Sequence, residues 1–214
     1  RYPDAAALRA EIEQLLARGV ATPVKEVRGL VAPHLDYARG APCYADAYAT
    51  LAATGPADRY VILGTNHFGR ATSVVATRKD FATPLGLVPT DQDLLTRLEQ
   101  RLNQPLVVDE LDHLREHSVE LQVHFLQVIA DGRPFQILPI LCPDACGPDG
   151  TARDGADGVD LRGFAAALNA VIAESKGRTV VIAGADLSHI GQRFQDPDPT
   201  TPERLEAVAR SDRK

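Results

Sequence analysis

The sequence predicts an α/β fold with three layers, in which helices cover both faces of a largely parallel sheet. Segments typical of strands and of helices alternate along the 214 residues. Strand segments such as Tyr60–Leu63 and Thr179–Ala183 are continuous apolar runs. Such runs are typical of parallel strands that are buried on both faces. With 44% apolar and 24% charged residues, the composition is that of a globular chain.

The first half of the chain divides into helix, strand and loop segments. Asp4 can cap a first helix, whose apolar residues recur at helical spacing through Leu16. A strand, a helix and two short strands are expected next, at Val27–Ala32, Ala41–Ala53, Tyr60–Leu63 and Ser73–Ala76. The stretch Phe81–Pro89 contains two prolines and a glycine, so we expect a loop there.

The second half continues the alternation. A helix is expected from Asp91, and Ser118 is expected to cap another helix that runs to Ile129. The remaining expected elements, in order, are a brief strand, a strand, a loop, a helix, a strand and a polar helix: Val107–Val108, Phe135–Leu141, Cys142–Val159, Leu161–Ala173, Thr179–Ala183 and the tail from Pro202.

Charge and cysteine content limit the classes of partner. The formal charge is −6 and there is no basic stripe, which argues against nucleic acid and anionic membranes as partners. No apolar run reaches the roughly 18 residues of a membrane span, and no signal peptide is visible. The odd set Cys43, Cys142 and Cys146 fits a reducing compartment, so we expect a cytoplasmic protein. A structural zinc at Cys142 and Cys146 is disfavoured because no second ligand pair lies near them.

Three expected strands are each followed by histidine. His34 follows the first strand, His67 follows the apolar strand at 60–63, and Asp186 with His189 follows the late strand. Ligands of open α/β sheets bind beyond the carboxyl ends of the strands. If the three strands are parallel neighbours, these side chains meet in one crevice, and we favour a shared site over three unrelated loop histidines.

The residue types at this crevice indicate metal chemistry. Neutral imidazoles suit Fe(II), Zn(II) or Cu. Asp186 can serve as a ligand or as the carboxylate that fixes a histidine tautomer. His189 can act as a general base near neutral pH. We expect Gly64 and Gly184 to let the backbone turn sharply beside the site.

A second histidine segment follows Asp112. The pattern from His113 to His117 matches an inverted zinc-peptidase motif, which needs both histidines on one helical face. Helical periodicity begins only near Ser118, which disfavours a peptidase. We expect His117 and Glu120 to point into the crevice from a helix start. The alternative is local hydrogen bonding of His117, with Glu120 placed by the helix dipole.

His124 is interpreted as a packed or surface residue of the expected helix. Arg39 and Arg115 can bind an acidic group of a substrate, but a solvated surface charge is the favoured interpretation of either arginine alone.

Taken together, these motifs resemble the Memo family, including the AmmeMemoRadiSam system protein B members. The resemblance covers residues 25–194 and rests on six blocks in family order: Ala32–Tyr37 with Arg39–Gly40, Leu63–His67, Lys79–Gly86, Arg115–Gln122, Leu138–Leu141 and Ala185–Gly191. It implies an extradiol dioxygenase (LigB)-like fold. Class III extradiol dioxygenases bind a non-haem iron with two histidines and a carboxylate, and Memo-like proteins use two histidines and a cysteine.

The resemblance also implies roles for single residues. His34 and His67 correspond to metal ligands, and Asp186, His189, His117 and Glu120 are expected around the same pocket as catalytic residues.

The chain departs from the family pattern at two places. Asp36 stands where many members have glycine, and the chain stops at Lys214, before the region expected to carry the third ligand. Arg1 as first residue and the absence of methionine also suggest an incomplete chain. We therefore expect residues 1–214 to form a single domain that lacks part of its C-terminal region.

Three functional hypotheses follow. The favoured one is a metal-dependent, dioxygenase-like oxidoreductase that holds Fe(II), or alternatively Zn or Cu, and takes a small-molecule or peptide ligand. The second is a non-catalytic ligand- or peptide-binding protein on the same fold, and the third is a zinc peptidase. A homo-oligomer is compatible with all three.

Overall fold

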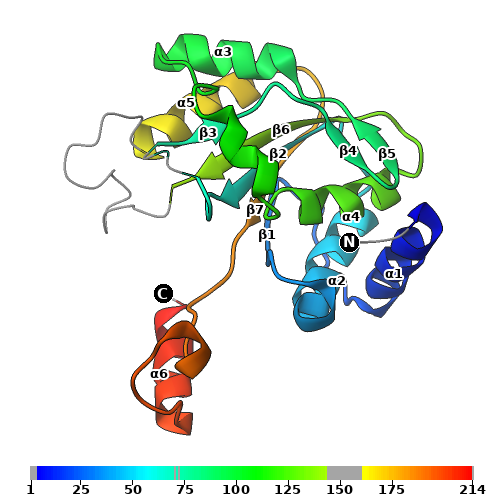
Figure 1. Ribbon diagram of the computed structural model, residues 1–214. Coiled ribbons are helices and arrows are strands. Elements are labelled where there is room, and N and C mark those ends of the chain that lie inside the picture. The colour runs from blue at the N-terminus through cyan, green and yellow to red at the C-terminus, as the bar shows by residue number, and fades with distance from the viewer. Residues whose placement is uncertain (1–3, 70, 72, 144–160, 214) are drawn as a thin grey trace.

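The computed structural model describes residues 4–69, 71, 73–143 and 161–213 (Figure 1). Its central sheet has five strands in the order β1-β7-β2-β6-β3. Their bounds are Gly29–Ala32 for β1, Thr179–Gly184 for β7, Arg59–Thr65 for β2, Gln136–Cys142 for β6 and Val75–Ala76 for β3. The first four run parallel, and β3 pairs antiparallel with β6. The predicted largely parallel α/β sheet is thus confirmed.

Helices cover both faces of the sheet (Figure 1). One face carries α1 (Ala5–Arg18), α2 (Tyr37–Ala53) and α4 (Glu120–Ala130), and the other carries α3 (Gln92–Leu102) and α5 (Leu161–Ala173). Successive side chains of β2 point to opposite faces: Tyr60 and Ile62 join the core cluster with α1, α2 and α4, whereas Val61 joins the one with α3 and α5. Both faces of the sheet are therefore buried, which explains why its strands are continuous apolar runs in the sequence.

Aromatic rings join α2 to α4 beneath the carboxyl edge of the sheet. Phe125 stacks on Tyr48 with ring centroids 4.3 Å apart and on Tyr44 with centroids 5.1 Å apart. The Tyr48 hydroxyl donates a hydrogen bond of 2.6 Å to Gln122 Oε1. Since all of these side chains except Gln122 are large apolar groups buried in one cluster, they hold the start of α4 in a defined position.

Two expectations about local structure are wrong. The stretch expected as a loop at 81–89 forms a β-hairpin, β4 (Phe81–Thr83) and β5 (Gly86–Val88). Pro84 lies in the turn, where no ladder hydrogen bond is needed, and Gly86 adopts a φ of +120°. The brief strand expected at Val107–Val108 is absent. The neighbouring strand β3 is only two residues long, and its Ala76 N–H donates to the carbonyl oxygen of Leu106, before the expected strand begins.

Both helices that border the site begin differently from the prediction. α2 starts at Tyr37 rather than Ala41, because the Asp36 side chain accepts the Arg39 N–H at 3.0 Å and caps it. This gives Asp36, the departure from the family glycine, a structural role. Ser118 does not cap α4; its Oγ accepts from Thr65 N at 3.0 Å and donates to Thr65 O at 3.2 Å. Ser118 thereby ties the start of α4 to the end of β2.

Gly64 and Gly184 serve close approach rather than a sharp turn, since neither has a positive φ. A Cβ at position 64 would lie 2.4 Å from Ser118 Oγ, and one at position 184 would lie 2.8 Å from Ser118 O. The expected reason for these glycines was therefore wrong. Only glycine lets the ends of β2 and β7 touch the segment before α4.

Gly64→Ala is expected to destabilise the protein by about 1–3 kcal/mol, because the added methyl group displaces the buried Ser118 and overpacks the contact. Urea unfolding followed by circular dichroism measures the change. Gly29→Ala is the matched control, since its Cβ meets no atom closer than 3.3 Å. Equal stabilities of the two variants would contradict the expected steric conflict.

The C-terminal helix α6 (Pro202–Ser211) lies apart from the sheet, at the end of an extended segment that follows β7 (Figure 1). Thr201 caps it and Pro202 occupies its first turn, which confirms the polar helix predicted there. Among the described residues, no helix combines the length and apolar character that a membrane crossing requires.

Candidate functional site

Three neighbouring parallel strands, β1, β7 and β2, end at the same edge of the sheet and open into one pocket. The pocket has a volume of about 570 Å³. Its lining comprises His34, Leu35, Asp36, Arg39, His67, His117, Asp186, His189, Arg193 and Phe194. Five of the six residues predicted for the site, all except Glu120, therefore border one cavity.

His34 is the most buried ligand candidate, with 5% of its surface exposed. Its Nδ1 lies 2.7 Å from the carbonyl oxygen of Gly184, so Nδ1 must carry the hydrogen. In the neutral ring, Nε2 then presents a lone pair. That atom lies 3.6 Å from Asp186 Oδ2, while Asp186 Oδ1 accepts the His34 backbone N–H at 3.0 Å.

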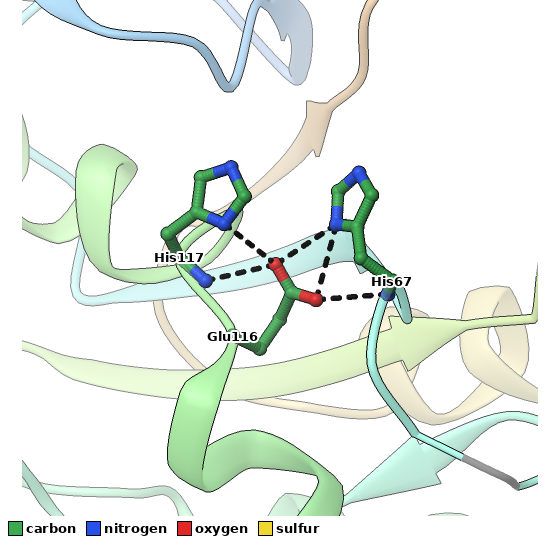
Figure 2. A group of neighbouring side chains, drawn as sticks. All are labelled: His67, Glu116 and His117. Atoms are coloured by element: carbon green, nitrogen blue, oxygen red, sulfur yellow. Dashed lines mark hydrogen bonds and ion pairs between the residues drawn. The ribbon is translucent and has the colours of Figure 1, made fainter.

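His67 and His117 share one carboxylate, that of Glu116 (Figure 2). The His67 Nδ1 lies 3.1 Å from both Glu116 oxygens, and the His117 Nδ1 lies 3.3 Å from Oε1. The backbone N–H groups of His67, His117 and Ser118 donate to the same carboxylate at 2.9, 2.8 and 3.0 Å. Figure 2 shows both Nε2 atoms on the side of the rings away from Glu116.

The Glu116 side chain is only 1% exposed. Burial alone would raise the pKa of Glu116, but the hydrogen bonds from the Ser118 and His67 N–H groups outweigh it and lower that pKa to about 2. A carboxylate so fully bonded favours Nδ1–H on both imidazoles and leaves their Nε2 atoms as acceptors. The described residues contain one cluster whose ligand atoms all lie within 4.8 Å, namely His67, Glu116 and His117. We assign Glu116 in it to support rather than ligation.

Sequence reasoning missed Glu116 as a site residue. It occupies the Glu position of the pattern from His113 to His117, and that pattern suggested a peptidase motif instead. The sequence offered one signal for this role: Glu116 directly precedes His117, and a second histidine, His67, follows a strand. Glu116 comes into contact with His67 only in the folded chain, because the two residues are 49 positions apart.

The three imidazoles lie close together around the pocket. The ring centroids of His34 and His67 are 4.8 Å apart, those of His67 and His117 5.2 Å, and those of His34 and His117 5.7 Å. Burial lowers the pKa of His117, and the neighbouring His67 and His34 rings lower it further, against the opposing effect of Glu116. The arrangement therefore favours the neutral form of the His117 ring, which is the protonation state in which an imidazole binds a metal.

His189 lies at the mouth of the pocket with half of its side chain exposed. Its Nε2 is 3.3 Å from Asp186 Oδ2, and its ring stacks on Phe194 with centroids 4.7 Å apart. Asp186 therefore contacts both the deepest histidine, His34, and the outermost one. Arg39, which pairs with Asp36, also lines this mouth. Its charge is thus part of the pocket lining, not only of the outer surface as expected.

Glu120 does not share the pocket of His34 and His67, contrary to expectation. It lines an adjacent pocket with His124 and His117. The reason is that α4 begins at Glu120, so its side chain faces the β4–β5 hairpin rather than the sheet edge. Of the predicted residues, only His117 borders both cavities.

The histidine pair of the peptidase pattern is not brought together. His113 belongs to a separate 3-10 helix, Glu110–Arg115, and its Nε2 lies 3.2 Å from the carbonyl oxygen of Val75. Glu116 is extended, so His113 and His117 do not share a helical face. Burial lowers the pKa of His113. Cys43 is exposed and Cys142 ends β6, while Cys146 lies outside the described residues.

The protein is thus an α/β protein with a mostly parallel sheet and a pocket of histidines and carboxylates at the carboxyl edge of that sheet. The model of the family described as "Memo-like protein" matches residues 2–214. The chain belongs to this Memo-like family.

Three relatives agree with the family assignment. A MEMO1 family protein of Methanosarcina acetivorans is 35% identical over 188 residues, which is 88% of this chain and 63% of the relative. One from Methanococcoides burtonii is 35% identical over 189 residues, covering 88% and 64% of the two chains. One from Methanopyrus kandleri is 36% identical over 185 residues, covering 84% and 60%. The chain thus spans somewhat less than two thirds of the length of these relatives.

Proposed function

We propose that the pocket at the sheet edge binds one divalent metal ion, preferably Fe(II), through Nε2 of His34 and His67. The observation that carries this proposal is the pair His34 Nε2 and Asp186 Oδ2. Both present lone pairs when the ring is neutral, yet they lie 3.6 Å apart in a largely buried site. Two buried acceptors facing one another are stabilised by a cation between them.

The surroundings of the two imidazoles fit a metal ligand set. Histidine ligands ordinarily donate their second ring N–H to a carbonyl or carboxylate. Gly184 O plays this part for His34, and Glu116 plays it for His67. With Asp186 as the carboxylate that faces His34 Nε2, the donors are two histidines and one acidic residue, a set typical of non-haem Fe(II) oxygenases.

The reaction class that we propose is oxidation related to that of the extradiol dioxygenases. Bound Fe(II) supplies a centre at which a substrate and dioxygen are held together. His189 accepts or delivers a proton at the mouth, where it is oriented by Asp186 and by stacking on Phe194. Asp186 orients His34 through its backbone N–H, and Arg39 favours a substrate with an acidic group at the entrance.

Anaerobic titration with Fe(II) tests the proposal. The 214-residue chain, first treated with a chelator, is expected to bind about one equivalent, with Zn(II) competing for the same site. His113→Ala is the matched control and is expected to bind equally, because His113 contacts Val75 outside the pocket. No saturable binding would overturn the proposal. Loss of binding in His113→Ala alone would favour the peptidase instead.

A further inference from the structure

A turn after β7 brings a second arginine to the mouth of the sheet-edge pocket. Arg193 and Phe194 lie in a short 3-10 helix, Gln192–Phe194, and both line that pocket. Gly191 precedes this helix with a φ of +104°, a conformation that residues with a side chain rarely adopt. The sequence therefore builds a tight turn at the point where Arg193 borders the cavity.

Helix α6 holds this turn in place. Asp196 Oδ2 accepts the Gly191 N–H at 2.6 Å and lies 2.7 Å from Nη2 of Arg204, which belongs to α6. The Ser188 hydroxyl donates to Asp212, at the end of α6, at 2.6 Å. Although α6 lies apart from the sheet (Figure 1), it is thus tied at two points to the segment that forms the pocket mouth.

The charges that line the pocket leave Arg193 without a counter-ion. Asp36 pairs with Arg39, and Asp186 lies 3.3 Å from Nε2 of His189. None of the ion pairs among the described residues includes Arg193, whose side chain is exposed. The guanidinium group is permanently charged, and its planar fork of N–H groups matches the two oxygens of a carboxylate. Arg193 is therefore the cation of this pocket that is available to an anionic ligand.

Apolar surface lies beside this charge. Phe194 is 46% exposed, and its ring stacks on His189 with centroids 4.7 Å apart. Leu35 adds aliphatic surface to the same lining. The volume of about 570 Å³ lies within the range of about 300–1,000 Å³ that is typical of small-molecule sites. A ligand that matches this mouth has one acidic group and an apolar body.

We infer that the sheet-edge pocket takes a small monocarboxylic acid, whose carboxylate pairs with Arg193 and whose apolar body lies against Phe194 and Leu35. A single negative charge is preferred because Asp36 and Asp186 also line the pocket. They repel the second charge of a dianion such as a phosphate monoester. The role of this acid as a substrate rests on the proposed function, whereas its binding requires only the pocket.

The test uses benzoate as the probe, benzamide as its uncharged isostere and phenyl phosphate as the dianion. The whole 214-residue chain is stripped of metal with a chelator, which is then removed by dialysis because common chelators are themselves carboxylates. Titrations are followed by the amide chemical shifts of Leu35 and Phe194. Benzoate is expected to bind saturably, and benzamide and phenyl phosphate at least about tenfold more weakly.

The metal-free state separates this inference from the metal proposal. A chain that binds Fe(II) but shows no saturable binding of benzoate would overturn the inference and leave the metal proposal standing. A chain that binds benzoate but no Fe(II) would support the acid subsite and remove the metal proposal.

One variant and a matched control locate the binding group. Arg193→Gln, at an exposed position without an ion pair, should leave the fold intact and is expected to weaken benzoate binding about tenfold. Arg115→Gln is the control, because Arg115 is also exposed but does not line the pocket. Equal binding of benzoate and benzamide, full benzoate affinity in Arg193→Gln, equal losses in the two variants, or tighter binding of phenyl phosphate than of benzoate would each overturn the inference.

Discussion

A protein carrying His34→Ala and His67→Ala together is expected to lose its divalent metal entirely. The two substitutions remove both proposed imidazole ligands. Asp186 is then the only member of the proposed donor set that remains. Loss of an outer-shell partner alone costs about 10- to 100-fold in metal affinity, so loss of two ligands must cost more. Metal analysis after anaerobic reconstitution with Fe(II) measures the effect.

The matched control for this variant removes two other histidines. His113→Ala together with His189→Ala changes the same number of imidazoles, but His113 faces Val75 and His189 stands half exposed at the mouth. This control is expected to hold as much metal as the wild-type protein. Far-ultraviolet circular dichroism checks that both variants fold. Equal metal content in the two double variants would rule out His34 and His67 as the ligands.

Glu116→Gln is expected to have the next largest effect, on both metal affinity and stability. The carboxylate accepts three backbone N–H groups and a His67 ring N–H, and an amide must turn its own N–H₂ group toward some of these donors. Each buried donor left without an acceptor costs about 1–3 kcal/mol. Misoriented imidazoles should also lower Fe(II) affinity about 10- to 100-fold. Urea unfolding and metal titration measure the two effects separately.

The stability effect of Glu116 should depend on pH in a defined window. The folded-state pKa of Glu116 is about 2, below its ordinary value of 4.5. A carboxyl group with a depressed folded pKa stabilises the protein above its unfolded pKa, and the stabilisation is lost as pH falls through the folded pKa. In metal-free protein, the difference between wild type and Glu116→Gln should thus be constant above pH 5 and shrink toward pH 2. The shrinkage is expected to be on the order of 2 kcal/mol, discounted for solvent in the open pocket.

Glu99→Gln provides the control for the effect on metal affinity, because Glu99 pairs with Arg78 and is not among the residues that line the sheet-edge pocket. Its effect on Fe(II) affinity is expected to be nil. A pH-independent difference between wild type and Glu116→Gln would show that the carboxylate does not act through its charge.

Much of the pocket at the carboxyl edge of the sheet could be predicted from the sequence, because the strands and the residues that follow them are local features. Apolar runs predicted β2 and β7, and a parallel sheet brings the carboxyl ends of its strands to one edge. His34, His67 and Asp186 could therefore be placed together from their positions after strands. Where a local signal was ambiguous the prediction failed: two prolines suggested a loop at 81–89, although neither occupies a position that the hairpin needs for pairing.

What the sequence by itself determined was the parallel α/β class and the gathering of histidines beyond the strands, since both follow from periodicity and strand ends. Only the tertiary structure decided how those histidines are held. Glu116 reaches His67 across 49 residues, and the close approach of Ser118 to Gly64 needs contact between separate segments. The separation of Glu120 from the sheet-edge pocket depends on where α4 begins. Such contacts are set by packing in three dimensions, which no local pattern of residues encodes.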